Sequence, residues 1–448
     1  MVNIGSVLLI LFLIFGNIKY NTKELYYVFL LKVLIVFSLY IQIGYFIQIG
    51  SFQLEYSELL MIIIVVLGFS SFKNGKVPIL SWLVFLGLMM SIVLGYFSLI
   101  FSQENSLVLA EGGSWDQVVW GNQFLTEATF TASNIMKLLR ILVFILLFWI
   151  IDMLLSQKNY IINELKIFTV NAGVVFAGIA LIEQITKTIL KSTVFLDVTT
   201  SIFGVAASQV TKNFERGGLF ALQGMTFEPS VFALSFLPPI LLLLTSSNFK
   251  EIKKFSILSL FIYVIICSGS FGGFALVAFF VGVYLFSNKK LIFMKIFCFS
   301  GLIILMVIII KFVPIFNEIF SYYFERIFSF VNSTGLGSET SRLYSVSIAL
   351  NAFKNNILFG IGLGSLDVHG FIPSLVSNIG LVGCLFFVLL LFKGSSNSKP
   401  KNILLFLYML PFLYLTGSLR LIYSMHIMIL FLLVFREHSQ KEELEKVT

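Results

Sequence analysis

Arginine is the residue type whose distribution along this chain most directly suggests chemistry. It accounts for six of the 30 basic residues. Its guanidinium group is a planar fork that binds phosphate through two parallel hydrogen bonds and stays charged when partly buried. On the topology predicted below, four arginines fall on the outer side of the membrane, where the positive-inside rule expects few cations: Arg216, Arg326, Arg342 and Arg420. This indicates an anionic substrate at the outer leaflet; the alternative is that each arginine pairs with a carboxylate or reaches lipid headgroups.

Arg140 differs from these four because it lies inside a predicted span. Lys137 precedes it by three residues, so the two cations share one helical face. An ionisable residue at membrane depth is a functional hypothesis by default. Both also lie near the outer end of the span, where a long side chain can reach the interface.

The first motif-bearing stretch runs from Glu215-Arg216-Gly217-Gly218 to Glu228-Pro229-Ser230. Pro229 suits the first turn of the helix that we expect to follow, which puts Glu228 at the N-cap. Glu228 is then either a carboxylate that interacts with the helix dipole, or a general base or a partner that orients Arg216.

The second stretch begins at Ser341-Arg342 and predicts an amphipathic helix lying on the membrane, with Tyr344, Ile348 and Phe353 on its apolar face. A glycine turn at 360–364 follows, then Asp367 and His369. No strand precedes the glycines, so a dinucleotide-binding turn is rejected. His369 stands at a junction between a loop and a helix, where it is either a proton acceptor or a residue that caps and packs.

The elements that position these residues follow from composition. The chain has 448 residues, of which 58% are hydrophobic and 12% charged, and its mean hydropathy is +1.00. These values exclude a soluble enzyme. Three widely separated cysteines exclude a disulfide scaffold. The net charge of +8 comes from basic residues between apolar runs, which reports membrane orientation and not nucleic-acid binding.

About thirteen apolar runs are long enough to cross a membrane, with a range of twelve to fourteen. The first lacks a basic flank and a cleavage site, so we interpret it as a retained span. The predicted spans are 3–18, 27–47, 56–72, 78–101, 134–155, 166–187, 228–247, 255–270, 271–287, 295–313, 372–392, 402–417 and 420–435.

Lysines set the orientation of these spans. With the amino terminus outside, most basic residues fall in cytoplasmic connections or in the tail at 436–448, and the connection at 102–133 has no Lys or Arg. Three outer segments are then long, at 102–133, 188–227 and 314–371. We expect them to pack over one integral membrane domain, residues 1–448, with the last two carrying the active site.

At these two stretches the chain resembles the bacterial superfamily of O-antigen polymerases (Wzy-type) and O-antigen ligases (WaaL-type). The shared pattern is Arg, Gly, Phe and then Glu-Pro-Ser opening a span, followed by Arg, a helix, Gly-x-Gly-x-Gly-Ser, His, and Gly-Leu-x-Gly. Ser268-Gly269-Ser270 departs from the pattern, since relatives often have Ser-Arg there. Glu228-Pro229-Ser230 is more polymerase-like, and polymerase is the favoured interpretation.

The resemblance implies an all-α polytopic membrane protein with a GT-C-like fold. It implies metal-independent and cofactor-free transfer of glycan from undecaprenyl diphosphate at the periplasmic face of the bacterial inner membrane. Lipid-linked oligosaccharide would be both donor and acceptor, and a chain-length regulator and a flippase of the same pathway are possible partners. Arg216 and Arg342 resemble the family's loop arginines, and His369 resembles the histidine of the ligases.

The expected mechanism places the diphosphate on Arg216 and Arg342, with Arg326, Arg420 and Arg140 as secondary ligands. Glu228, His369 and Asp367 are the alternatives for the general base, and a single displacement would invert the anomeric centre. A ligase that transfers glycan to lipid A-core, a polysaccharide flippase or other transporter, and a structural partner of an export complex are the competing interpretations.

Overall fold

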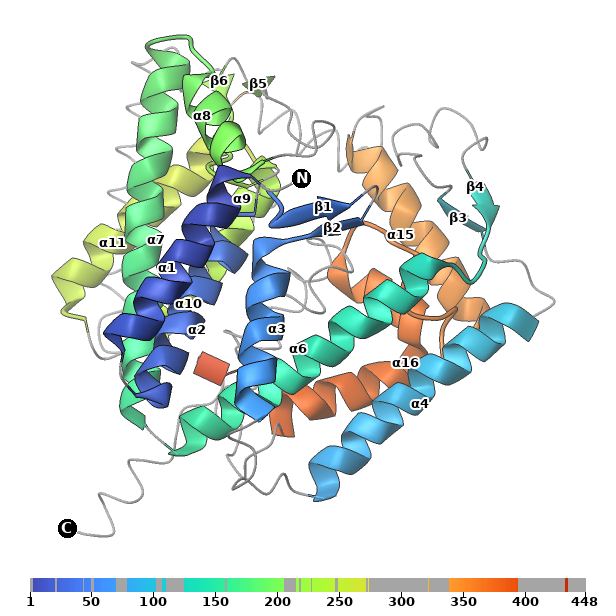
Figure 1. The fold of residues 1–448 in the computed structure, drawn as a ribbon. Helices are drawn as coiled ribbons and strands as arrows, with labels where there is room; N and C mark the ends of the chain where they lie inside the picture. Colours follow the sequence, from blue (N-terminus) through green and yellow to red (C-terminus); the bar gives the residue numbers. More distant parts are fainter. Residues whose placement is uncertain are drawn as a thin grey trace. The chain divides into compact units, whose positions relative to one another are not determined.

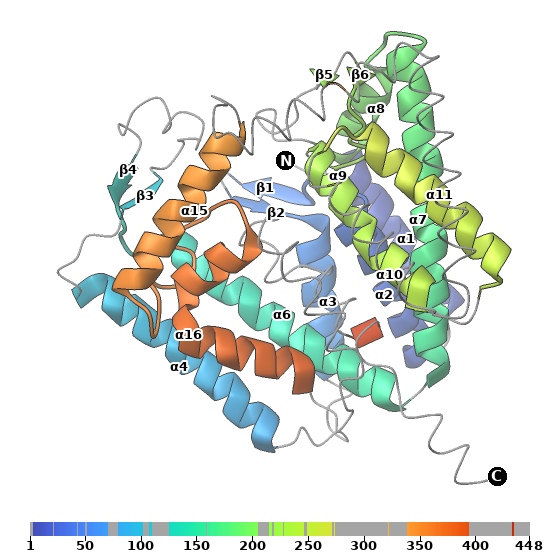
Figure 2. The same cartoon turned by 180° about the vertical axis from the view of Figure 1, so that it is seen from behind.

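The structure is a computed structural model of the chain, and helices predominate in the part it describes (Figure 1; the reverse view is Figure 2). The chain divides into two compact units, each built from two separated stretches of sequence. The structure describes residues 3–20, 22–42, 44–49, 52–69, 79–101, 107–109, 125–157, 159–204, 215–216, 219–226, 228–245, 249–270, 273, 321, 338–393 and 432–433.

The first unit comprises residues 1–60 and 163–331. Its core includes Tyr40 stacked on Phe176, with ring centroids 4.6 Å apart, and Phe236 against Phe261 at 5.2 Å. Its helices are α1 (Ile4–Lys19), α2 (Lys23–Leu39), α7 (Asn159–Thr188, which starts just before the unit boundary), α8 (Val194–Phe203), α9 (Pro229–Ser235), α10 (Leu237–Thr245) and α11 (Glu251–Cys267). α1 packs against α2 and α8, and α10 packs against α9 and α11. Two antiparallel hairpins pair β1 (Ile47–Ile49) with β2 (Phe52–Leu54) and β5 (Glu215–Arg216) with β6 (Leu219–Phe220).

The second unit comprises residues 61–162 and 332–448. Its helices are α3 (Tyr56–Phe69, which starts in the first unit), α4 (Ile79–Phe101), α6 (Ala132–Gln157), α15 (Ser338–Asn355) and α16 (Phe371–Lys393), and an antiparallel hairpin pairs β3 (Leu107–Leu109) with β4 (Leu125–Glu127). α4 packs along α16, and α15 also packs against α16. Trp149 of α6 is buried against Trp82 and Phe85 of α4.

Four helices in the described part of the chain are long and apolar enough to cross a membrane: Ile79–Phe101, Ala132–Leu155, Tyr160–Thr188 and Phe371–Phe392. On α4, Leu83, Leu86, Met90 and Phe97 recur at helical spacing on one face, and each is more than half exposed. An apolar exposed face suits contact with lipid tails. The protein is therefore a predominantly α-helical, membrane-embedded protein.

The predicted spans at 78–101, 134–155, 166–187 and 372–392 coincide with these four helices. The prediction of a continuous span at 27–47 is wrong, because α2 ends at Leu39 and residues 47–49 form a strand. The span at 228–247 is interrupted at Phe236, where Leu237-Pro238-Pro239 begins a second helix. The spans at 271–287, 295–313, 402–417 and 420–435 lie almost entirely outside the described residues, as does the tail, so the total of thirteen stays a prediction.

Candidate functional site

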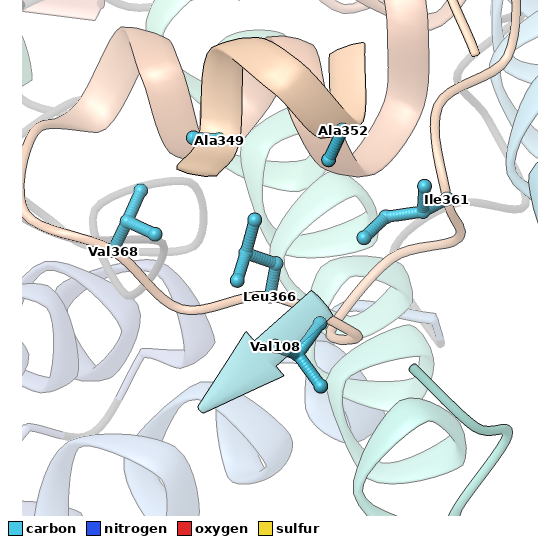
Figure 3. Packing of buried hydrophobic residues seen from close by; sticks show 6 residues of the cluster. All are labelled: Val108, Ala349, Ala352, Ile361, Leu366 and Val368. Carbon is cyan, nitrogen blue, oxygen red and sulfur yellow. The ribbon is translucent and has the colours of Figure 1, made fainter. Parts of the chain in front are cut away.

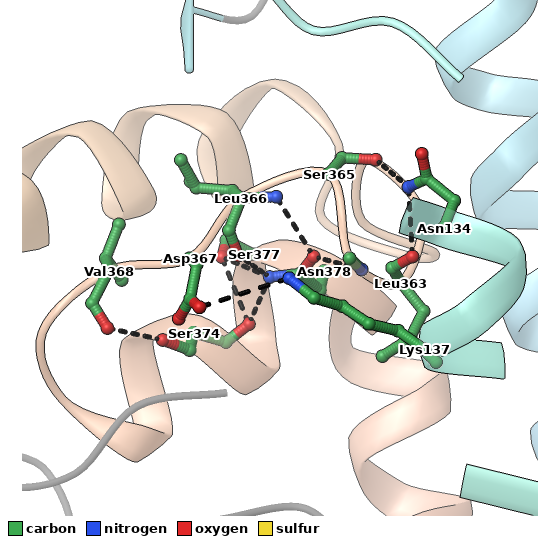
Figure 4. A network of polar contacts seen from close by, with 11 residues as sticks. Asn134, Lys137, Leu363, Ser365, Leu366, Asp367, Val368, Ser374, Ser377 and Asn378 are labelled. Carbon is green, nitrogen blue, oxygen red and sulfur yellow. Dashed lines mark hydrogen bonds and ion pairs between the residues drawn. The ribbon is translucent and has the colours of Figure 1, made fainter. Parts of the chain in front are cut away.

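The connection between α15 and α16 carries Asp367 and His369, and the side chain of Asn378 organises it. Asn378 is fully buried in α16. Its Oδ1 accepts hydrogen bonds from the N–H groups of Gly364 (2.8 Å) and Leu366 (3.3 Å), and its Nδ2 donates to the carbonyl oxygen of Leu366 (2.7 Å) (Figure 4). The connection is thus held by hydrogen bonds to its backbone.

A second set of hydrogen bonds ties the same connection to α4 and α6. Asn134 Nδ2 donates to the carbonyl oxygen of Leu363 (3.0 Å) and to Ser365 Oγ (2.9 Å). The hydroxyl of Tyr96 lies 2.9 Å from the same Leu363 oxygen and 3.1 Å from the carbonyl oxygen of Asn134. Helices far apart in the sequence therefore determine where this connection lies.

α16 bends at Gly380, whose φ of 64° and ψ of −175° are not helical. A Cβ atom at this position would lie 2.3 Å from the carbonyl oxygen of Leu358. The N–H groups of Leu381 and Val382 donate to the carbonyl oxygens of Ile357 and Leu358. The bend therefore lets α16 bond to the start of the connection, and glycine is required there.

Lys137 of α6 extends along this connection toward Asp367 (Figure 4). Its Nζ lies 4.0 Å from Asp367 Oδ2; 14% of the lysine side chain and 44% of the aspartate side chain are exposed. Arg140 follows on the same helical face and is partly buried. The sequence singled out Lys137 only as a cation on one helical face with Arg140. It did not predict that Lys137 pairs with Asp367.

Ser345, which is buried in α15, links the backbone of His369 to the backbone of Arg342. The N–H group of His369 donates to Ser345 Oγ (3.3 Å), and this hydroxyl donates to the carbonyl oxygen of Arg342 (2.8 Å). Both the arginine and the histidine are partly buried. The contact to Arg342 lies within α15, whereas the contact to His369 fixes the backbone of the connection against this helix.

A small apolar cluster lies between α15, β3 and the connection that follows α15 (Figure 3). Tyr344 and Ile348 pack against it, so these two residues of α15 contact protein, and the placement of the helix on the membrane stays a prediction. β3 contributes Val108, and Leu125 and Ala128 of the same segment also pack against the cluster. The cluster consists of Val108, Ala349, Ala352, Ile361, Leu366 and Val368.

The other motif belongs to the first unit. Glu228 is the N-cap of α9 and Pro229 occupies its first turn, which confirms both predictions. The Glu228 side chain is exposed, and its Oε2 accepts a hydrogen bond from Ser230 Oγ (2.9 Å). Arg216 pairs with Leu219 in the hairpin of β5 and β6.

Sequence reasoning did not find a buried ion pair in α7, close to this motif. Lys187 Nζ lies 2.6 Å from Glu183 Oε1, and the two side chains are 3% and 0% exposed. The signal was present in the sequence, because two opposite charges four residues apart interrupt an apolar helix of 29 residues.

Comparison of the chain with protein-family models, with curated proteins and with solved structures finds no significant match. The roles assigned to the candidate residues therefore rest on the residues themselves and on the resemblance described above. Arg326 and Arg420 lie outside the described residues.

The candidate residues that the structure describes belong to different units. Arg342 lies in α15, Asp367 and His369 lie in the connection to α16, and Lys137 and Arg140 lie in α6, all within the second unit. Arg216 and Glu228 belong to the other unit. Within the described ranges, no group of three or more His, Cys, Asp or Glu residues could hold a metal ion.

Proposed function

We propose that this protein is a membrane glycosyltransferase that polymerises lipid-linked oligosaccharide repeat units into O-antigen or a related surface polysaccharide. The observation that carries the proposal is the hydrogen-bonded link from Arg342 through Ser345 to His369, with Lys137 beside the same connection. The link joins backbone groups, and the two residues that it connects carry a guanidinium group that can bind an anion and an imidazole that can accept a proton.

In the proposed reaction, a sugar hydroxyl at the end of one lipid-linked glycan attacks the anomeric carbon of another. The bond from this carbon to the diphosphate oxygen breaks, and undecaprenyl diphosphate leaves with the bonding electrons. The Arg342 and Arg216 guanidinium groups stabilise the charge that develops on the leaving group, with Arg326, Arg420 and Arg140 as further ligands. Attack on the face opposite the leaving group inverts the anomeric centre.

A general base takes the proton of the attacking hydroxyl as the new bond forms. Glu228 and His369 are the stronger candidates, because both are at least partly exposed and lie beside a helix start. Asp367 is the weaker candidate because Lys137 pairs with it. The proposal also includes about thirteen spans in a GT-C-like fold and an active site that faces the periplasm.

The test uses purified full-length protein in nanodiscs with an undecaprenyl-diphosphate-linked repeat unit, and products are resolved by gel and mass spectrometry. The wild type should give a ladder of lengthening glycans, and Arg342→Ala and Arg216→Ala should abolish it. Lys354→Ala is the matched control, because Lys354 is exposed near the end of the helix that carries Arg342.

Other outcomes would replace the proposal. A single transfer that requires lipid A-core would identify a ligase. If the ladder persists in both arginine variants, the proposed diphosphate ligands are wrong. If the wild type forms neither product, the proposed enzyme is wrong. Transport of the intact lipid-linked unit across a vesicle membrane would then favour a flippase.

A further inference from the structure

The ion pair of Glu183 and Lys187 lies inside an apolar helix that is long enough to cross a membrane. Charged side chains within such helices are costly and usually serve a function. Replacing a buried pair with apolar residues often leaves stability unchanged or raises it, so overall stability is a weak reason to keep one. The other groups that Glu183 and Lys187 bind therefore indicate what the pair does.

Both members of the pair bond to the backbone of residues 221–224. Glu183 Oε2 accepts from the N–H group of Gly224 (2.7 Å), and Oε1 lies 3.4 Å from the backbone nitrogen of Gln223. Lys187 Nζ lies 3.4 Å from the carbonyl oxygen of Ala221. The carboxylate and the ammonium group thus bind opposite ends of one short, fully buried segment that is not helical.

Two more elements hold this segment. The N–H group of Leu222 donates to the carbonyl oxygen of Cys267 at the end of α11 (3.2 Å). The N–H group of Gln42, just after α2, donates to the carbonyl oxygen of Met225 (2.9 Å). Glu183 and Lys187 bond to the segment through charged groups, which make stronger hydrogen bonds than the backbone groups of these two elements do.

The segment turns at Gly224, whose φ is +56°. A Cβ atom there would lie 2.7 Å from the ring of Phe232 in α9. The left-handed backbone and the aromatic ring together require glycine at the position whose N–H group meets Glu183.

Thr226 continues the chain of contacts to Glu228. Its Oγ1 lies 2.8 Å from the carbonyl oxygen of Gln223 and 3.0 Å from that of Glu228. The backbone that Glu183 binds is therefore joined by one hydroxyl group to the residue proposed as a general base. On its other side, the segment continues directly from the hairpin that carries Arg216.

We propose that Glu183 and Lys187 are positioning residues that hold segment 221–226, and through it Glu228 and the hairpin of Arg216, in the geometry that glycosyl transfer requires. This inference rests on the proposed function. Neither residue touches substrate in this account; both act through the backbone of the segment.

The decisive comparison is between two double variants that leave no unpaired charge. Glu183→Gln/Lys187→Gln keeps groups that can bond to the Gly224 N–H and the Ala221 carbonyl, whereas Glu183→Leu/Lys187→Met removes both. The control, Lys32→Met/Glu164→Leu, removes an ion pair between α2 and α7 that bonds to no part of the segment.

Each protein is assayed in nanodiscs for turnover and for hydrogen–deuterium exchange in peptides that cover residues 221–226. In the apolar variant we expect faster exchange in these peptides alone and a kcat about 10- to 100-fold lower, with KM for the lipid-linked donor nearly unchanged. The glutamine variant should recover most of the wild-type kcat and most of the wild-type protection from exchange. The control should match the wild type in both. A merely structural role would lower the yield of folded protein without this split between kcat and KM.

Wild-type exchange and wild-type kcat in the apolar variant would overturn the inference, as would faster exchange with unchanged kcat. If the apolar variant does not fold, Glu183→Lys/Lys187→Glu takes its place, because it keeps a charge pair but turns an ammonium group toward the Gly224 N–H. If the wild type forms no glycan ladder, the proposed function fails on its own. Exchange in the variants then shows separately whether the pair holds the segment.

Discussion

The side chain of Asn378 bonds to the backbone of Leu366 in both directions, as a neighbouring strand would. Its Oδ1 accepts from the Leu366 N–H at 3.3 Å, and its Nδ2 donates to the Leu366 carbonyl at 2.7 Å. One buried side chain thus replaces the regular secondary structure that the connection between α15 and α16 lacks. The position of Asp367 and His369 depends on it.

Asn378→Leu should destabilise the protein by about 2–4 kcal/mol, because a side chain of similar size would leave several buried backbone groups without partners. The free energy of unfolding in detergent, followed by tryptophan fluorescence, provides the measurement. Asn351→Leu, at an exposed position of α15, should change it by less than about 0.5 kcal/mol. Equal effects of the two substitutions would contradict the role given to Asn378.

Two glycine-to-alanine substitutions should have opposite effects. Gly380→Ala should destabilise by more than about 1 kcal/mol, because a Cβ would meet the Leu358 carbonyl at 2.3 Å on a left-handed backbone. Gly178→Ala should stabilise by about 0.5–1 kcal/mol, because the position is helical and nothing lies within 4 Å of the added atom. Unfolding midpoints of the two variants, measured side by side, test both predictions. An unchanged midpoint in Gly380→Ala would show that the bend in α16 does not require glycine.

Arg342→Lys tests whether diphosphate binding needs a guanidinium group or only positive charge. The planar fork bonds to two phosphate oxygens at once and an ammonium group does not. We expect Arg342→Ala to lower kcat by about 10²- to 10³-fold, as loss of one oxyanion donor does elsewhere, and Arg342→Lys to recover only part of it. Initial rates of glycan lengthening give the answer, and full activity of the lysine variant would exclude bidentate binding.

The general base can be identified by comparing Glu228→Gln, His369→Asn and Asp367→Asn. We expect one of the first two to lower kcat by about 10²- to 10⁴-fold and to remove one limb of the pH–rate profile. Asp367→Asn should change the rate far less, since its carboxylate pairs with Lys137. Ser230→Ala is the control for Glu228, because it removes only the hydroxyl that bonds to this carboxylate. A large loss in Asp367→Asn alone would reverse the assignment.

The ion pair in α7 makes a prediction about stability that is separate from catalysis. Lys187→Met should destabilise by about 3–5 kcal/mol, because it leaves a buried carboxylate without its cation. Adding Glu183→Leu should recover much of this loss, since the unpaired charge is then gone. A double-mutant cycle on the free energy of unfolding measures the coupling, and additive effects would show that the two charges do not depend on each other in the folded protein.

Local rules account for what could be predicted from the sequence. Apolar length and few charges located the helices at 79–101 and 371–393, because a membrane span must satisfy its own backbone and present apolar side chains. Proline in a first helical turn placed Glu228 at an N-cap, since its missing N–H is not needed there. The same hydropathy extended the predicted span at 27–47 past the end of α2 at Leu39, because apolar residues also occur in the hairpin that follows.

The sequence by itself therefore determined a helical, membrane-embedded chain with two polar motifs near helix starts. Tertiary structure decided which backbone groups the buried side chains bind: Asn378 binds Leu366, Ser345 binds His369, and Glu183 binds Gly224. These pairs lie on different elements, so no periodicity or spacing predicts them. They form because a buried backbone group outside regular secondary structure needs a hydrogen-bonding partner, and the packing of helices decides which side chain is close enough to provide it.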